Sequence, residues 1–267
     1  MPYAQSDDAR IYFEQHGDGS GPPLVLIRGT GADGTRWMPQ VEAYSPEVPC
    51  VIFDGRGVGQ SDTTPAPYTV EQMAGDTLAV MDEAGIDAAH VAGSSLGGAI
   101  GLHLAVHAPD RVLTLQLHSS WLATRGFSAY SLGLLKKFLV TGGTDFYYEA
   151  TLPLLFSCSF MMDNFDHLMK ILAHMQAHSA TREGLLGQIE ANLSYDLSAE
   201  AGRVKAPTLI TVGDLDYVLP VSCSRELHGA IAGSELVVFE GCGHLVTMEN
   251  SEEFNRVTLD WLRPHLR

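Results

Sequence analysis

The chain has 267 residues, 45% of them hydrophobic and 18% charged, a composition typical of a globular protein with a sizeable core. Its 16 basic and 32 acidic residues give a formal net charge of −16, which disfavours binding to nucleic acids and anionic membrane surfaces. The sequence contains no apolar run of membrane-spanning length and no signal-peptide pattern. We therefore expect a cytoplasmic protein that contacts neither nucleic acid nor membrane, and the sequence leaves the oligomeric state open.

Short apolar runs alternate with helical patterns along most of the chain, which predicts a mainly parallel sheet covered by helices. An alternation of polar and apolar residues at 10–15 predicts an edge strand ahead of these runs. Thr69 with Gln72, and Asn250 with Glu253, are typical of helix starts. The remaining strands are expected at residues 24–27, 51–53, 90–92, 112–117, 208–212 and 236–239.

The alternation stops after about Trp121 and resumes near Pro207. The segment between them is rich in Leu, Met, Phe and Tyr, and Gly142-Gly143 predicts a break within it. We predict an α/β core formed by residues 1–121 and 200–267, with a helical cap at 122–199 inserted over the carboxyl ends of the strands. Ligands bind at that edge in open parallel sheets.

A G-x-S-x-G motif is centred on Ser95, between Gly93 and Gly97. An apolar strand precedes it and a helix rich in small residues follows, which is the context that a nucleophile elbow needs. The sharp turn from strand to helix would project the serine oxygen above the sheet, near the positive end of the helix. We predict that Ser95 is the catalytic nucleophile.

A serine hydroxyl needs a neighbouring base and an acid that orients the base. Among 11 histidines, His244 follows the last strand in a loop that would lie over the sheet. Asp214 and Asp216 both follow the strand at 208–212, and Asp216 is preferred because its place further into the loop gives it more freedom to reach His244. The order Ser, Asp, His is typical of this chemistry on a parallel sheet.

Two backbone N–H groups are expected to stabilise the oxyanion that forms during acyl transfer. One belongs to Leu96, the residue after the nucleophile, and the other to Thr30, in the loop after the strand at 24–27.

These residues together resemble the α/β-hydrolase family along the whole chain. The resemblance includes the Arg28-Gly-Thr-Gly31 loop, the turn at 53–61, the elbow at Ser95, Gly213-x-x-Asp216 and Gly243-His244. The sequence looks most similar to compact capped members such as 3-oxoadipate enol-lactonases, small esterases and cofactor-free haloperoxidase-like enzymes. The resemblance implies hydrolysis of an ester, lactone or thioester through an acyl-enzyme. Arg28 departs from the family, which usually has histidine at this position.

Two patterns favour other classes of function. Gly29-x-Gly31-x-x-Gly34 followed by Asp54 matches a dinucleotide-binding fingerprint, but Asp33 lies where pyrophosphate needs positive potential and no long helix follows. The pairs His103/His107 and His174/His178 have the spacing of metal ligands but no third ligand, and the four cysteines show no metal-binding spacing. We therefore expect neither a cofactor nor a metal.

The expected substrate is a small-molecule ester or lactone with a mostly apolar acyl group. Phe156, Phe160 and Met161 are candidate substrate-binding residues from the cap. Arg28 could bind a substrate carboxylate, although an ion pair with an acidic loop residue such as Asp54 is the favoured interpretation. The alternatives are a slow-turnover small-molecule sensor on the same fold, or a carbon–carbon bond hydrolase or acyltransferase that uses the same three residues.

Overall fold

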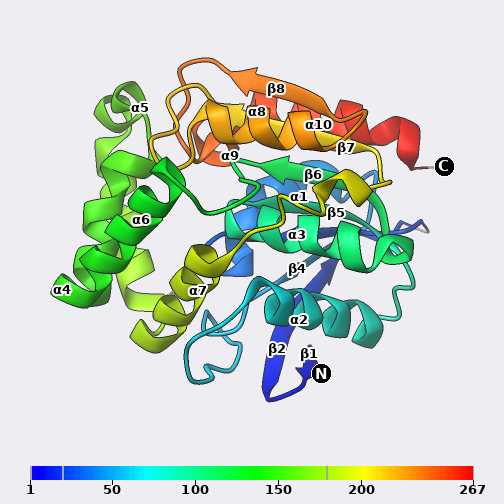
Figure 1. Ribbon diagram of the computed structural model, residues 1–267, viewed down its shortest axis with the longest axis horizontal. Coiled ribbons are helices and arrows are strands. Elements are labelled where there is room, and N and C mark those ends of the chain that lie inside the picture. Colours follow the sequence, from blue (N-terminus) through cyan, green and yellow to red (C-terminus); the bar gives the residue numbers. More distant parts are fainter. Residues whose placement is uncertain (1, 20, 179, 267) are drawn as a thin grey trace.

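The computed structural model describes residues 2–19, 21–178 and 180–266, and its centre is a twisted eight-stranded sheet (Figure 1). The strand order is β1-β2-β4-β3-β5-β6-β7-β8; β2 pairs antiparallel with both β1 and β4, and all other neighbouring strands pair parallel. The strands are β1 (Tyr3–Ser6), β2 (Ala9–His16), β3 (Leu24–Ile27), β4 (Cys50–Phe53), β5 (Ala89–Ser94), β6 (Val112–His118), β7 (Thr208–Gly213) and β8 (Glu235–Phe239). The predicted mainly parallel sheet is confirmed.

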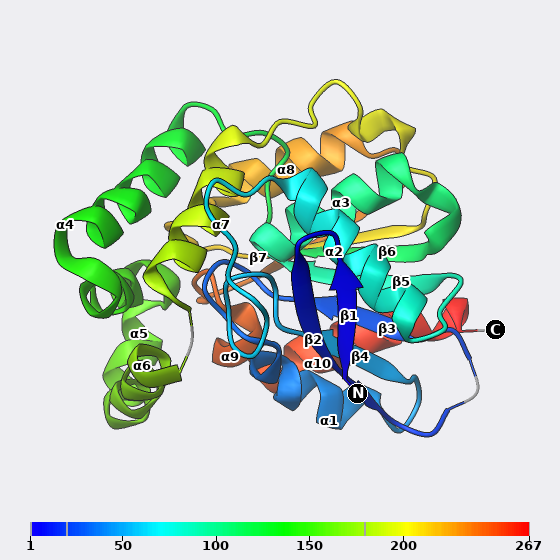
Figure 2. The same cartoon turned by 90° about the horizontal axis from the view of Figure 1, so that it is seen from below.

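Helices cover both faces of the sheet, and Figure 2 shows the two layers from below. One face carries α2 (Val70–Glu83), α3 (Leu96–His107) and α8 (Val221–Ala230), whose buried residues join the larger apolar core. The other carries α1 (Met38–Tyr44) and α10 (Ser251–Leu262), which pack over a second core. The other helices outside the β6–β7 insertion are short: α9 (Val246–Glu249) and the 3-10 helices Gly34–Trp37, Pro109–Arg111, Ala201–Arg203 and Arg263–His265.

Four helices lie between β6 and β7, grouped beyond the end of the sheet to which β6 and β8 point (Figure 1). They are α4 (Phe127–Leu155), α5 (Cys158–Asp163), α6 (Phe165–His178) and α7 (Arg182–Ser194). The expected break falls inside α4, where Gly143 has φ 77° and ψ −171°. Backbone bonds from Thr124 N to Tyr195 O (2.8 Å) and from Leu197 N to Leu122 O (3.1 Å) join the two ends of this insertion. The proposed division at 121/122 and 199/200 stays a prediction.

Two local expectations differ from the structure. The strand predicted at 10–15 is not an edge strand, because β1 pairs along its outer side through a tight turn at Asp7, whose φ is 39°. The short Tyr3–Ser6 strand has too few residues to show a periodic pattern. Thr69 caps α2 by accepting a 3.0 Å bond from Gln72 N, whereas the Asn250 side chain makes no such bond at the start of α10.

Candidate active site

Ser95 lies on a sharp turn between β5 and α3. Its backbone has φ 55° and ψ −118°, a left-handed region that a non-glycine residue adopts at a cost. Its N–H donates to His118 O (2.8 Å), and its carbonyl accepts from Gly98 N (2.9 Å) and from Ser120 Oγ (3.1 Å). These bonds hold the strained turn in place.

Glycines allow the chain to pass close to this turn. A Cβ on Gly97 would collide with the carbonyl groups of Ile27 and Arg28, and a Cβ on Gly93 would collide with Gly97. A Cβ on Gly29 would lie 3.0 Å from Ser95 Cβ, so the loop after β3 lies directly against the serine. Both glycines of the G-x-S-x-G motif are therefore required by packing.

Two neighbouring loops bring an acid and an imidazole together. The loop after β7 is joined to the loop after β8 by bonds from Asp214 N to Phe239 O (3.0 Å) and from Leu215 N to Cys242 O (2.9 Å). Gly213 lies against the carbonyl groups of the second loop, where a side chain would collide. These backbone hydrogen bonds hold the loop that carries Asp216 beside the loop that carries His244.

The imidazole of His244 and the carboxylate of Asp216 form a buried hydrogen bond of 2.7 Å, between Nδ1 and Oδ2. The other carboxylate oxygen of Asp216 accepts from the N–H groups of Val218 (2.9 Å) and Leu219 (2.8 Å). Because an ionised carboxylate only accepts, Nδ1 of His244 carries the proton, and Nε2 of the neutral ring is an acceptor. Asp214, the alternative acid, is exposed.

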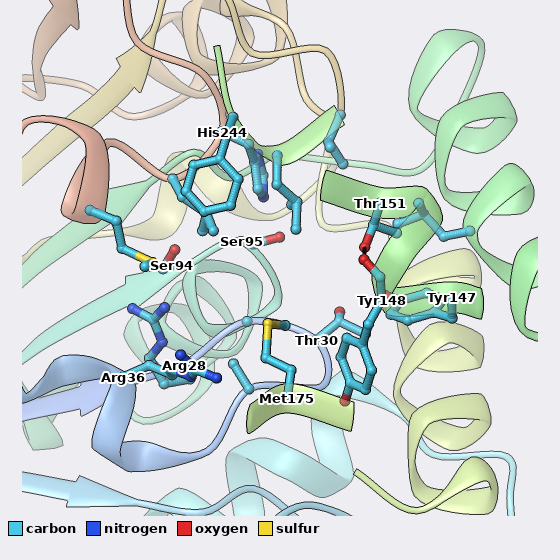
Figure 3. Close-up of a pocket in the computed structure, with 18 of the residues that line it drawn as sticks. Arg28, Thr30, Arg36, Ser94, Ser95, Tyr147, Tyr148, Thr151, Met175 and His244 are labelled. Carbon is cyan, nitrogen blue, oxygen red and sulfur yellow. Dashed lines mark hydrogen bonds between the residues drawn. The ribbon is translucent and has the colours of Figure 1, made fainter. Parts of the chain in front are cut away.

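Ser95 and His244 both line one cavity under the inserted helices (Figure 3). Its walls are mostly apolar: Leu132, Leu135, Tyr147, Leu155, Phe156, Ile171, Met175, Val218, Leu245 and Met248. Thus the structure brings Ser95, His244 and Asp216 from three strand ends to one place.

Residues after β6 connect the serine with the histidine, and sequence analysis did not assign them a role. Ser119, with φ 47°, donates from Oγ to His244 O (2.8 Å), and its N–H donates to Thr211 O (2.8 Å). Ser120 supports the carbonyl of Ser95, as described above. The only signal in the sequence is their place at the end of a parallel strand.

The loop that contains Thr30 is held by the inserted helices. Asn192 Nδ2 donates to Thr30 Oγ1 (2.8 Å), Gln188 Oε1 accepts from Gly31 N (2.8 Å), and Tyr148 OH donates to Gly31 O (3.0 Å). Within the described residues no acceptor is recorded for the backbone N–H of Thr30 or Leu96. Thr30 lines the cavity, while Leu96 is fully buried and is not among the residues that line it. Sequence analysis missed these supporting residues because they lie far from the loop in the sequence.

Arg28 lines the cavity, but it does not pair with Asp54 as the favoured interpretation held. The two oxygens of Asp54 accept from Gly34 N and Gln60 N, both at 2.8 Å, so this carboxylate supports the backbone of two loops. Arg28 lies instead over the Trp37 ring, 4.6 Å from its centroid. Burial and the nearby Arg36 lower the pKa of Arg28 to about 9, and Asp33 opposes that shift.

The three apolar candidates from the inserted helices have different positions. Phe156 lines the cavity, and Phe160 stacks on it with 5.5 Å between ring centroids. Phe160 and Met161 are not among the residues that line this cavity, and Met161 lines a separate surface hollow. Phe156 precedes α5, whereas Phe160 and Met161 lie within it, since α5 begins at Cys158.

The residues considered for metals and dinucleotides have other contacts. In the described part of the chain no three His, Cys, Asp or Glu residues form a metal-binding group. The rings of His103 and His107 are 4.3 Å apart on α3, and the His178 side chain lies outside the described residues. Gly29 packs against Ser95 and Gly31 against Leu185, so the glycines let this loop lie close to the turn at Ser95. That the protein uses no metal or cofactor stays a prediction.

Comparison with known proteins gives the family. A family model described as alpha/beta hydrolase fold matches residues 22–156. The chain belongs to the α/β-hydrolase family. A relative from Azorhizobium caulinodans named "Putative carbamate hydrolase RutD" is 31% identical over 97% of each chain. Its namesake from Escherichia coli is 31% identical over 90% of this chain and 91% of that one.

Solved structures agree with this assignment. The enol-lactonase from Burkholderia xenovorans LB400 is 30% identical, with a TM-score of 0.89 over 98% of this α/β hydrolase and 100% of that chain. A hydrolase from Pseudomonas aeruginosa is 28% identical, with a TM-score of 0.87 over 97% of each chain. Both likenesses extend over nearly the whole chain, and the protein is accordingly a hydrolase of this fold. Within the described residues, no helix has the length and apolar character required to cross a membrane.

Proposed function

We propose that this α/β hydrolase cleaves an ester, lactone or thioester through an acyl-enzyme on Ser95. The observation that carries the proposal is the buried 2.7 Å hydrogen bond between His244 Nδ1 and Asp216 Oδ2. His244 lines the same cavity as Ser95. Its apolar walls suit a small or medium acyl group. The four inserted helices act as a cap over this cavity.

In the proposed reaction His244 Nε2 takes the proton of Ser95 Oγ as the oxygen attacks the substrate carbonyl. The protonated ring then gives that proton to the leaving oxygen or sulfur. Asp216 stabilises the imidazolium and keeps the ring in its Nδ1–H tautomer. In the second half a water molecule, deprotonated by the same nitrogen, attacks the acyl-enzyme; the acyl bond to Ser95 Oγ then breaks, the imidazolium returns its proton to Oγ, and the acid is released.

The oxyanion of each tetrahedral intermediate would accept from the N–H groups of Thr30 and Leu96. Both groups lack another recorded acceptor among the described residues, and Leu96 begins α3, where the helix dipole favours negative charge. Bonds from Asn192 and Gln188 to the Thr30 loop would keep this donor in place when the oxyanion forms.

Carbamate hydrolysis is a second candidate, favoured by the names of relatives that match nearly the whole chain. A carbamate carbonyl can be attacked by the same serine, with the oxyanion in the same site. A slow-turnover sensor, or a carbon–carbon bond hydrolase or acyltransferase, would use the same three residues and would differ in turnover rate or products.

The test is steady-state turnover of p-nitrophenyl acyl esters of increasing chain length, with a lactone, a thioester and a carbamate in parallel. Ser95→Ala and His244→Ala should reduce turnover to near the uncatalysed rate. Ser222→Ala, which alters an exposed serine on α8, is the matched control and should retain full rate. Turnover by Ser95→Ala at the rate of the unmodified protein would exclude the proposed nucleophile.

A further inference from the structure

Two arginines lie on one side of the cavity. Arg28 follows β3 directly, and Arg36 lies in the 3-10 helix Gly34–Trp37. Both line the cavity that contains Ser95 and His244, and Figure 3 shows their nitrogen atoms close together on the side of the loop after β3. The otherwise apolar cavity therefore has one strongly cationic wall.

Arg28 has no counter-ion in the described part of the chain. Its side chain is buried, with 8% of the residue exposed, and its Nε and Nη1 atoms have no hydrogen-bond partner. Nη2 of Arg36 is also buried without a partner. Asp33 raises the pKa of Arg28, but its Oδ1 accepts from the backbone and side chain of Thr35. Guanidinium N–H groups that are buried without acceptors are costly, and a ligand that supplied acceptors would remove the cost.

Arg56 shows how this protein satisfies a buried arginine that has a structural role. Its Nε and Nη2 atoms each donate to Asp76 at 2.6 Å, and its Nη1 donates to Asp8 at 3.2 Å. Arg28 is also buried but has no ion-pairing carboxylate among the described residues. The contrast indicates that the missing partner of Arg28 comes from outside the chain.

Charge around Arg28 also favours an anion. Its pKa of about 9 leaves the guanidinium charged near neutral pH, and Arg36 adds a second cation. Burial, together with Arg28, lowers the pKa of the buried His118 imidazole to about 3, so this ring is neutral near neutral pH and adds no competing charge. Because the net charge of the chain is −16, attraction of an anion has to come from these local groups.

We propose that Arg28, assisted by Arg36, binds a free carboxylate of the substrate while Ser95 attacks the ester or lactone carbonyl. The preferred substrates are then half-esters of dicarboxylic acids, or lactones that carry a carboxylate. A planar guanidinium matches a carboxylate with two parallel hydrogen bonds, and the apolar residues that line the same cavity would accommodate the connecting methylene groups.

The kinetic test rests on the proposed function and compares monomethyl glutarate with dimethyl glutarate, which differ only in one free carboxylate. The unmodified protein should show the higher kcat/KM for the half-ester. Arg28→Met should lower the half-ester to diester ratio by about 30- to 100-fold, the loss expected for a charged hydrogen-bonded pair. Arg28→Lys should keep part of the preference for the half-ester. Arg225→Met removes an exposed arginine from α8 and should leave the ratio within about two-fold.

A binding test needs no turnover and separates the two proposals. Calorimetry should detect glutarate binding to Ser95→Ala and lose it in the double variant Ser95→Ala/Arg28→Met, while each variant keeps a cooperative melting transition. Arg28-dependent binding without ester turnover would support the carboxylate site and contradict the hydrolytic function. An unchanged kinetic ratio in Arg28→Met, glutarate binding that does not depend on Arg28, or tighter binding of inorganic phosphate at the same site would each overturn the inference.

Discussion

Asp216 contacts His244 with one carboxylate oxygen and the backbone with the other. Oδ2 lies 2.7 Å from Nδ1 of the imidazole, and Oδ1 accepts from the N–H groups of Val218 and Leu219. The carboxylate therefore cannot rotate without losing three hydrogen bonds. This arrangement fixes the ring so that Nε2 is the nitrogen left to act as a base.

Asp216→Asn should lower kcat by about 10³- to 10⁴-fold, because an amide that donates to Nδ1 stabilises the wrong tautomer of His244. Steady-state kinetics on an activated ester measures the loss. Asp214→Asn is the matched control, since Asp214 lies two residues away and is exposed. If the Asp214 variant lost more activity than the Asp216 variant, the orienting acid would have been misassigned.

Arg28 and Arg56 should respond in opposite ways to removal. Arg56→Met leaves the Asp76 carboxylate buried without its cation and should lower the free energy of unfolding by about 3–5 kcal/mol. Arg28→Met removes an unpaired buried cation and should leave the free energy of unfolding within about 1 kcal/mol of the unmodified value, or raise it. Urea denaturation measures both. A strong loss of stability in Arg28→Met would indicate a structural role and weaken the assignment of a ligand site.

Two buried histidines should make the fold sensitive to acid. Burial, and to a lesser extent His265, lowers the pKa of His90 to about 4, and its Nδ1 contacts Thr114 Oγ1 at 2.9 Å. His118 is bound in the same way to Thr211. As pH falls below about 6.5, the unfolded chain takes up these protons first, so stability is present above that pH and is lost toward pH 4.

His90→Asn should reduce the loss of unfolding free energy between pH 7 and pH 5 by about 1–2 kcal/mol, because asparagine cannot take up a proton. Urea denaturation at the two pH values gives the difference. His167→Asn changes an exposed histidine on α6 and should retain the pH dependence of the unmodified protein. Equal pH dependence in all three proteins would contradict this origin of acid sensitivity.

Gln188 should affect activity without touching the substrate. It bonds Gly31 N at 2.8 Å and Arg56 O at 3.0 Å, so Gln188→Leu leaves two buried backbone groups unpaired and frees the loop that contains Thr30. We expect a loss of about 10-fold or more in kcat with a smaller change in KM, as for a weakened oxyanion donor. Gln176→Leu, an exposed change on α6, is the control. A pure KM effect of Gln188→Leu would contradict the positioning role.

The sequence was sufficient to predict the sheet, and to predict that Ser95, Asp216 and His244 lie at its carboxyl edge, because each has a local signal; their catalytic roles stay a prediction. Ser95 lies in a motif bounded by strand and helix, and Asp216 and His244 follow apolar runs that became adjacent parallel strands, β7 and β8. Strand β1 was missed because four residues carry little periodicity, and β2 was consequently placed at the edge of the sheet.

The details around the site depend on contacts between distant parts of the chain. Gln188 and Asn192 meet the Thr30 loop across 157 and 162 residues, and no local pattern predicts such a partner. The favoured Arg28–Asp54 pair is wrong for a different reason, since the backbone N–H groups of Gly34 and Gln60 bind both oxygens of Asp54. Phe156 lines the cavity and Met161, five positions later and inside α5, does not, a difference that composition alone does not predict.

The most direct test of the central claim is to treat the protein with a fluorophosphonate and to locate the adduct by mass spectrometry of its peptides. We predict a single covalent adduct on Ser95, absent from Ser95→Ala and formed much more slowly in His244→Ala, whose serine lacks its base. An adduct on another residue, or labelling of Ser95→Ala at the rate of the unmodified protein, would contradict the account.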